Sequence, residues 1–149
     1  MSLQSPLPFY YVQITKAATV TTSALSAAPL VIGSVVSIPV NILASTVSNA
    51  WLEGIGLTYD YKLSVGVEIG TVDLQNSLDG GTTFSSISAS TRGSGSSAAF
   101  ATITKLQTPI QILPVATPLQ FRIAAYVNVG AETLSVKNLS AKFILNLSD

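Results

Sequence analysis

The sequence predicts an all-β fold: a single-domain antiparallel β-sandwich, jelly-roll-like, with about 8–10 strands. Apolar and polar residues alternate along most of the chain. Turn-forming segments, such as Asp79-Gly80-Gly81 and Leu113-Pro114, separate the alternating runs. No segment keeps apolar residues at helical spacing over three turns, and the Ala-rich residues 19–28 come nearest to a short helix.

The alternating runs define the expected strands in order along the chain. In each run one parity is apolar and predicts the buried face. After Ile69 the apolar parity changes to that of Val72 and Leu74, and we expect a β-bulge at Gly70 to cause this change. The apolar sets are Val36, Ile38 and Val40; Leu63, Val65, Val67 and Ile69; Phe121, Ile123, Ala125, Val127 and Val129; and Leu139, Ala141, Phe143, Leu145 and Leu147.

The length of 149 residues fits one domain, which we place at residues 9–149. Residues 1–8 contain Pro6 and Pro8 and are expected to form an extended N-terminal arm. Long strands, long connections and a strand at the extreme C-terminus favour a jelly roll over a small barrel. Strand order does not follow from periodicity.

Three consecutive aromatic residues, Phe9, Tyr10 and Tyr11, begin the first expected strand. Neighbouring side chains on a strand point to opposite faces, so rings are expected on both faces and one face needs cover. A sheet of the same subunit is one source of cover. A neighbouring subunit is the other, because Tyr and Phe concentrate in interface cores. These residues are therefore the candidate interface, whereas Trp51 is expected to pack in the core.

One local motif stands out, the segment from Ser77 to Phe84 with the sequence SLDGGTTF. In a tight hairpin Asp79 can accept hydrogen bonds from backbone amides, while Gly80 and Gly81 supply positive φ angles. Phe84 is expected to return to the core as an anchor. The segment therefore predicts a structural turn at Asp79, Gly80 and Gly81.

This segment resembles the Asp-box hairpin, S-x-D-x-G-x-T-W/F, which is best known from sialidases. There the motif repeats and lies away from the active site. One copy over eight residues, with no propeller period, does not support a sialidase. Similar hairpins occur in β-domains of bacteriophage and viral particles. The resemblance implies a virion structural protein of the minor capsid or decoration type.

Charge is scarce along the chain. Seven basic and seven acidic residues make up 9% of the chain, where a soluble domain usually has roughly a quarter. The surface is therefore either coated with hydroxyl and amide groups, since 35 residues are Ser or Thr, or covered by other protein. The net charge of zero, with basic residues scattered singly, argues against nucleic acid as a partner.

No membrane span is predicted, although 36 uncharged residues separate Lys16 from Glu53. Twelve of them are Ser, Thr or Asn, and Pro29 and Pro39 interrupt them, so no window of about 20 residues is continuously apolar. The N-terminal sequence has no basic segment followed by an apolar one, so we expect no signal peptide.

Catalytic chemistry is not expected. The chain has neither histidine nor cysteine, which removes the usual triads and most zinc sites. Asp73, Asn76 and Asp79 are the few candidate oxygen ligands for a calcium ion, which needs about six to eight. We therefore expect no catalytic residues, no metal and no cofactor. Further carboxylates stand isolated in sequence, although folding can bring two together: Glu53, Asp60, Glu68 and Glu132.

The sequence thus predicts a non-enzymatic structural subunit of a virus or phage particle, as a minor capsid, decoration (cement) or spike-base protein. It would act by oligomeric packing, with other copies of itself in a trimer or ring and with other virion proteins as partners. Its expected location is the virion, assembled in the host cytoplasm. The alternative is a carbohydrate- or receptor-binding sandwich, such as a lectin or adhesin head, with exposed aromatic residues as contacts. The candidates are Tyr10, Trp51, Tyr59 and Tyr61.

Overall fold

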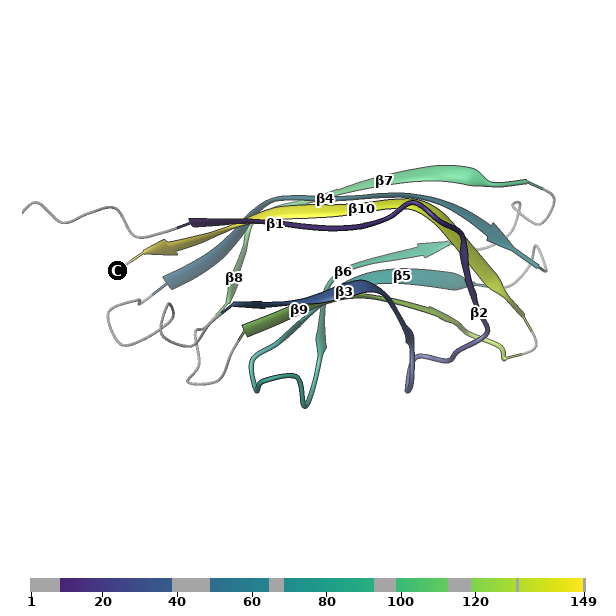
Figure 1. Ribbon diagram of the computed structural model, residues 1–149, viewed down its shortest axis with the longest axis horizontal. Coiled ribbons are helices and arrows are strands. Elements are labelled where there is room, and N and C mark those ends of the chain that lie inside the picture. The colour runs from purple at the N-terminus through teal and green to yellow at the C-terminus, as the bar shows by residue number, and fades with distance from the viewer. Residues whose placement is uncertain are drawn as a thin grey trace, which may run out of the picture.

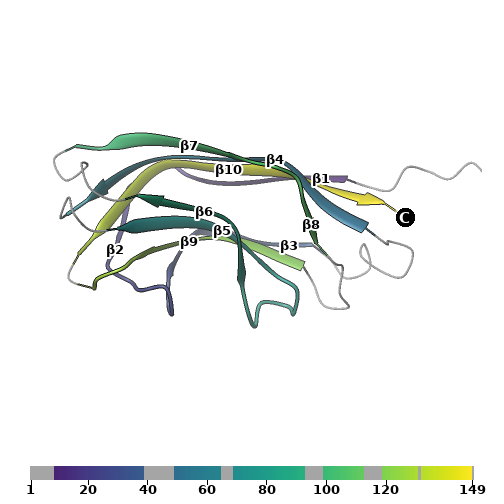
Figure 2. The same ribbon diagram turned by 180° about the vertical axis from the view of Figure 1, so that it is seen from behind.

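A computed structural model describes residues 9–38, 49–64, 69–92, 99–112, 119–130 and 132–148. Two antiparallel sheets lie face to face (Figure 1), and the reverse view shows the same two layers (Figure 2). The described ranges contain no helix, so the expected all-β sandwich is confirmed and residues 19–28 form no helix. Within these ranges no helix is long and apolar enough to cross a membrane. The expected arm, residues 1–8, lies outside the described residues.

The larger sheet has six strands in the order β1-β10-β4-β7, with β2 beside β10 and β8 beside β4. The smaller sheet has four strands in the order β3-β9-β5-β6. The six strands of the first sheet are β1 (Phe9–Lys16), β2 (Val20–Thr22), β4 (Asn49–Leu63), β7 (Ala101–Gln107), β8 (Ile110–Ile112) and β10 (Leu134–Ser148); the four of the second are β3 (Leu30–Ile38), β5 (Gly70–Ser77), β6 (Ser85–Arg92) and β9 (Leu119–Val127).

The connections give a jelly roll. β2 continues β1 along one edge of β10, and β8 continues β7 along one edge of β4. With these pairs merged, successive strands cross from one sheet to the other, except at the β5–β6 hairpin. This crossing pattern, together with the packing of two antiparallel sheets, confirms the jelly-roll-like prediction.

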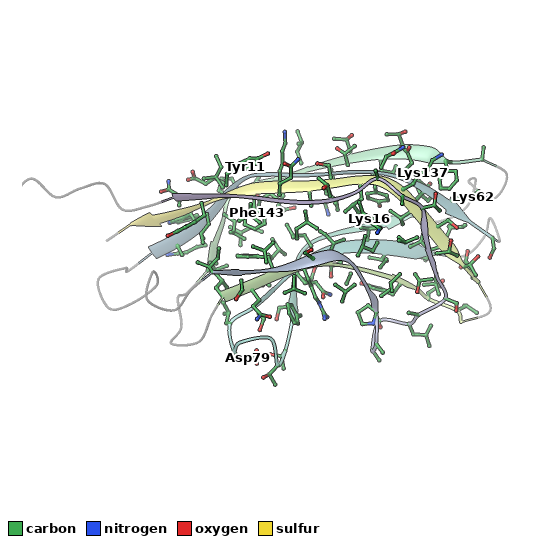
Figure 3. The ribbon with its side chains drawn as sticks, in the orientation of Figure 1. Tyr11, Lys16, Lys62, Asp79, Lys137 and Phe143 are labelled. Atoms are coloured by element: carbon green, nitrogen blue, oxygen red, sulfur yellow. The ribbon has the colours of Figure 1, made fainter. Side chains whose placement is uncertain are left out.

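The core lies between the sheets and follows the predicted parities in β9 and β10. Phe121 and Ile123 of β9 and Leu139 and Phe143 of β10 are all buried. The rings of Phe121 and Phe143 meet across the two sheets with centroids 4.6 Å apart, and Figure 3 shows Phe143 pointing between the layers. Burial of these apolar side chains stabilises the sandwich.

The predicted bulge at Gly70 is wrong. Gly70 begins β5 and pairs in register with Arg92 on one side and Val127 on the other. The apolar parity changes here because the chain leaves the six-stranded sheet after Leu63 and enters the four-stranded sheet at Gly70. Glycine is needed for packing, since a Cβ at Gly70 would lie 2.9 Å from methyl groups of Leu63 and Leu134.

Candidate interaction surface

The outer face of the six-stranded sheet carries apolar side chains at one end. Tyr11 is 59% exposed, Trp51 36% and Leu106 79%. They come from β1, β4 and β7, and β10 contributes the half-buried Ile144 between them. We call Tyr11, Trp51, Leu106 and Ile144 the apolar patch. Figure 3 shows Tyr11 on this outer side, near the end of the sandwich where β1 begins in Figure 1.

Strand register brings the patch residues together. Tyr11 lies opposite Ile144, and Ile144 lies opposite Glu53 of β4. Trp51 is two residues away from Glu53 along β4. Leu106 lies opposite the buried Gly56, and a side chain at Gly56 would lie 3.6 Å from Lys142 Cε and 3.7 Å from Leu106 Cδ2. The patch residues therefore span four strands, with Glu53 and Lys142 interspersed among them.

A β-bulge places Trp51 on this surface, and the expectation that it packs in the core is wrong. Ile55 and the buried residues that follow in β4 have the same parity as Trp51. The register between β4 and β10 shifts between Lys142 and Ile144, and Gly54 has a φ of 61°. The extra residue turns both Leu52 and Ile55 to the core and sends Trp51 outward.

The centre of the same outer face carries hydroxyl and amide groups. Thr58 Oγ1 donates to Thr104 Oγ1 at 3.4 Å, and Gln13 Nε2 donates to Ser140 Oγ at 3.5 Å. These long bonds between exposed side chains contribute little stability. They show that polar side chains occupy the middle of the face, where the exposed Lys142 also lies opposite Gln13.

Charges gather at the far end of this face. The Nζ atoms of Lys137 and Lys62 lie 4.2 and 5.7 Å from the ring centroid of Phe100. Asp60 accepts hydrogen bonds from Thr102 Oγ1 at 2.6 Å and from Asn138 Nδ2 at 2.9 Å. These two bonds lower the pKa of the Asp60 carboxyl below its ordinary value. The face therefore grades from apolar to charged along its strands.

The structure separates the three predicted interface residues. Tyr10 lies partly buried against the core, opposite the buried Leu145, whereas Tyr11 points outward. Phe9 is in β1, but its side chain lies outside the described residues. The same subunit therefore covers Tyr10, whereas Tyr11 is exposed on the outer face of the six-stranded sheet.

Sequence reasoning missed Leu106 and Ile144, although the sequence carries a signal for both. In β7 the exposed parity is Thr102, Thr104 and Leu106, so Leu106 is the apolar residue among polar ones. Ile144 likewise shares the parity of the exposed Lys142 and Asn146. An apolar residue on the solvent parity of a strand is therefore the feature that marks this surface.

The hairpin after β5 is held by Asp79. Its Oδ1 accepts hydrogen bonds from the backbone amides of Thr82 at 3.1 Å and Thr83 at 2.9 Å, and from Ser77 Oγ at 2.7 Å. Its Oδ2 accepts from Thr83 Oγ1 at 2.6 Å. These bonds, led by the Thr83 hydroxyl, hold the pKa of the Asp79 carboxyl well below its ordinary value. Gly80 and Gly81 both have positive φ.

Phe84 does not return to the core, contrary to expectation. The guanidinium carbon of Arg122 lies 3.8 Å from the centroid of the half-buried Phe84 ring. Arg122 Nε donates to Gln75 Oε1 at 2.8 Å. Arg122 alternates with the buried Phe121 and Ile123 on β9, so it lies on the other face of the sheet. Phe84 therefore anchors the hairpin to the outer face of the four-stranded sheet.

A buried carboxylate lies beside this stack. Asp73 is 2% exposed and accepts hydrogen bonds from Ser86 Oγ at 2.7 Å and Gln75 Nε2 at 3.0 Å. Burial raises the pKa of Asp73 above its ordinary value, and the hydrogen bonds and the charges of Lys105 and Arg122 oppose that shift. Asp73 and Asp79 bond different partners, and the described residues hold no group of three metal-binding side chains.

The structure contradicts the prediction that Tyr59 and Tyr61 are exposed sugar contacts. Tyr59 and Tyr61 are 1% and 6% exposed, because the bulge at Gly54 leaves their parity facing the core. Tyr10 is also packed against the core. Of the four aromatic candidates, Trp51 is exposed on the outer face of the six-stranded sheet.

Two further carboxylates stand isolated in sequence. Glu68 lies outside the described residues, and Glu132 is buried.

No protein-family model matches the chain, and no curated protein matches its sequence. Solved structures with a similar fold include the Eiger TNF from S. frugiperda, with a TM-score of 0.56 and 10% identity over 95% of this chain and 94% of that chain. A structure of the Gt strain of infectious bursal disease virus has a TM-score of 0.49 and 11% identity. It is matched over 97% of this chain and 33% of the viral chain.

A second viral structure, the VP2 protein of infectious bursal disease virus in derived T=1 particles, has a TM-score of 0.41 and 10% identity over 99% of this chain. This chain spans 42% of that VP2 chain. The match to the Eiger TNF runs over nearly the full length of both chains. At 10% identity the similarity to the Eiger TNF shows the fold alone, and the chemistry of the surface depends on this chain's own residues.

Proposed function

We propose that this chain is a non-enzymatic structural subunit of a viral particle, as a minor capsid, decoration or spike-base protein, and that it acts by packing against other copies of itself and other particle proteins. The observation that carries the proposal is the apolar patch. Tyr11, Trp51 and Leu106 are exposed on one face of the six-stranded sheet. Large apolar side chains that are exposed on the same face are a common site of protein contact.

Charge supports an assembly role. The charged residues that lie among the patch side chains, Glu53 and Lys142, have opposite signs. Interface cores are depleted in charge and enriched in aromatic residues. A chain with 9% charged residues therefore has a surface suited to burial against protein.

The jelly roll supports the viral setting, since viral capsid domains commonly use this fold. The same fold also serves lectin domains, so fold alone does not select one function. The hairpin of Ser77 to Phe84 adds its resemblance to virion β-domains. Labelled electron microscopy of particles from the native source would locate the protein, and its absence from such particles would overturn the viral assignment.

Trp51 allows a direct test of the patch, because it is the single tryptophan of the chain. We expect sedimentation to show oligomers that dissociate on dilution, with a red shift of tryptophan emission as Trp51 becomes exposed. Leu106→Ser should weaken association. Val129→Ser is the matched control, since Val129 is an exposed apolar residue in the β9–β10 connection, outside the patch. A monomer at every concentration would overturn the proposal.

The second candidate function is carbohydrate binding, which the joint exposure of Tyr11 and Trp51 favours. Their strands, β1 and β4, are separated by β10 alone, so the two backbones lie about 10 Å apart, and both rings are on the same face. Aromatic rings at such spacing can contact successive sugar units. Glycan arrays with the isolated protein test this candidate, and Trp51→Ser should abolish any binding observed.

A further inference from the structure

β1 is an edge strand that lacks the features by which proteins usually block strand addition. It pairs with β10 through eight consecutive residues without a register shift. Within the described part of the chain, no strand pairs with its other edge. Pairing groups at an open edge invite another strand, and natural edges are usually blocked by charge, proline, bulges or short length.

The other edge strands in the described ranges have features that block the addition of a further strand. β3 has a register shift between Ile32 and Val36, with Gly33 at a φ of 74°. β6 shifts register opposite Leu74 and Gln75. β7 has a charged residue, the half-buried Lys105, on the parity of the core-facing Ala101 and Ile103, and Thr108-Pro109 separates it from β8. β2 is three residues long. β1 has one charge, Lys16 at its end, and none from Phe9 to Thr15.

From this contrast we propose that β1 pairs antiparallel with β1 of a second copy across a twofold axis, which joins two six-stranded sheets into one continuous sheet. The inference rests on the proposed function, because it names a second copy as the partner and adds β1 as a contact beside the apolar patch. Twofold symmetry suits an antiparallel strand pair, since each strand meets itself in the opposite direction.

The residue pattern selects one register, with Val12 opposite Val12 of the partner subunit. Core-facing residues then meet core-facing residues, as Tyr10 lies opposite Ile14 of the partner subunit. On the outer face, Tyr11 lies opposite Gln13 of the partner subunit. This register uses Phe9 to Thr15 and leaves Lys16 outside, whereas a register centred on Gln13 would set Lys16 against the core-facing Tyr10.

The surroundings of the edge suit this contact. A groove of about 150 Å³ beside it is lined by Gln13, Ile14 and Thr15 of β1 and by Ser34 and Val36 of β3. Val35, between those two β3 residues, is 46% exposed. A second copy at β1 would cover this groove and extend the outer face that carries Tyr11.

A charge exchange at two exposed positions tests the register. Tyr11→Lys with Gln13→Lys places two like-charged pairs across the interface, and Tyr11→Lys with Gln13→Glu places two opposite-charged pairs. Both variants lose Tyr11 equally, but Gln13 also lies opposite Lys142 of the same subunit, so the stability of each monomer is measured beside its association and subtracted from the comparison. We expect the like-charged variant to dimerise more weakly than the opposite-charged one by roughly tenfold or more in Kd. Circular dichroism on dilute protein checks that both fold.

Each outcome decides one of the two proposals. A weaker dimer in the like-charged variant alone, with slower amide exchange in β1 at high protein concentration, supports the β1 contact. Equal association of both variants overturns it, whether both stay associated or both dissociate, and leaves the apolar patch as the contact. Wild-type protein that remains monomeric overturns the proposed function itself.

Discussion

Gly54 determines the side of the sheet on which Trp51 lies. The positive φ of Gly54 accompanies a bulge between β4 and β10. Because the bulge adds one residue, the β4 side chains N-terminal to it point to the opposite face of the sheet from the one their parity would otherwise give. Trp51 joins Tyr11 on the outer face for this reason, and Leu52 joins the core. A backbone feature at one glycine thus creates the most aromatic part of the proposed contact surface.

Gly54→Ala should lower the free energy of unfolding by about 1–2 kcal/mol, because a side chain at positive φ strains the backbone. Gly56→Ala is the matched control in the same strand. Its Cβ would make ordinary contacts of 3.6 Å to Lys142 Cε and 3.7 Å to Leu106 Cδ2. Urea denaturation measures both variants, and equal stability of the two would contradict the role of Gly54.

Gly70→Ala should cost about 1–3 kcal/mol of stability for a different reason, overpacking against Leu63 and Leu134. Leu134→Ala in the Gly70→Ala background should recover part of that loss relative to the sum of the two single changes. Thermal unfolding of the two single variants and the double variant gives the comparison. Simple additivity would show that Gly70 is needed for another reason.

Arg122 and Phe84 should be coupled by about 0.5–1 kcal/mol through their stacking contact. A double-mutant cycle with Arg122→Lys and Phe84→Leu measures this energy by urea denaturation. Lysine keeps the charge but loses the flat guanidinium and its Nε bond to Gln75. A coupling of zero would mean that the hairpin is held to the sheet by its turn bonds alone.

Asp79→Asn should lower the melting temperature at neutral pH, because an amide oxygen cannot replace both carboxylate oxygens. The folded-state pKa of Asp79 lies below its ordinary value, so its stabilising effect is present above that value and is lost as pH falls through the lowered pKa. The difference between wild type and variant should stay constant from about pH 5 to 8 and shrink in more acidic solution.

Asp73→Asn should show the opposite pH dependence, since burial raises the pKa of Asp73. A raised folded-state pKa favours folding below the ordinary value of 3.8, and this benefit is lost as pH rises through the raised pKa. The variant should therefore gain stability relative to wild type as pH rises from about 3.5 to neutrality. Parallel pH profiles for wild type and variant would contradict the shift.

The fold class and much of the core follow from the pattern of residues along the chain. Alternation in β9 and β10 identifies their buried faces, because a regular strand keeps one parity on one side. The SLDGGTTF segment likewise identifies a turn, because the bonds of Asp79 are local. These features need no knowledge of which strands are neighbours.

Other features follow only from the folded chain. They are the face on which a residue lies where the parity changes, and the contacts between residues far apart in sequence. The bulge at Gly54 exposed Trp51 and buried Tyr59, although both have the same parity in sequence. The crossover before Gly70 gave the same signal as a bulge, and Arg122, 38 positions along the chain, drew Phe84 to an outer face. Sequence periodicity indicates which residues lie on the same face of a strand. Which of the two faces is buried depends on strand pairing between segments far apart in the chain.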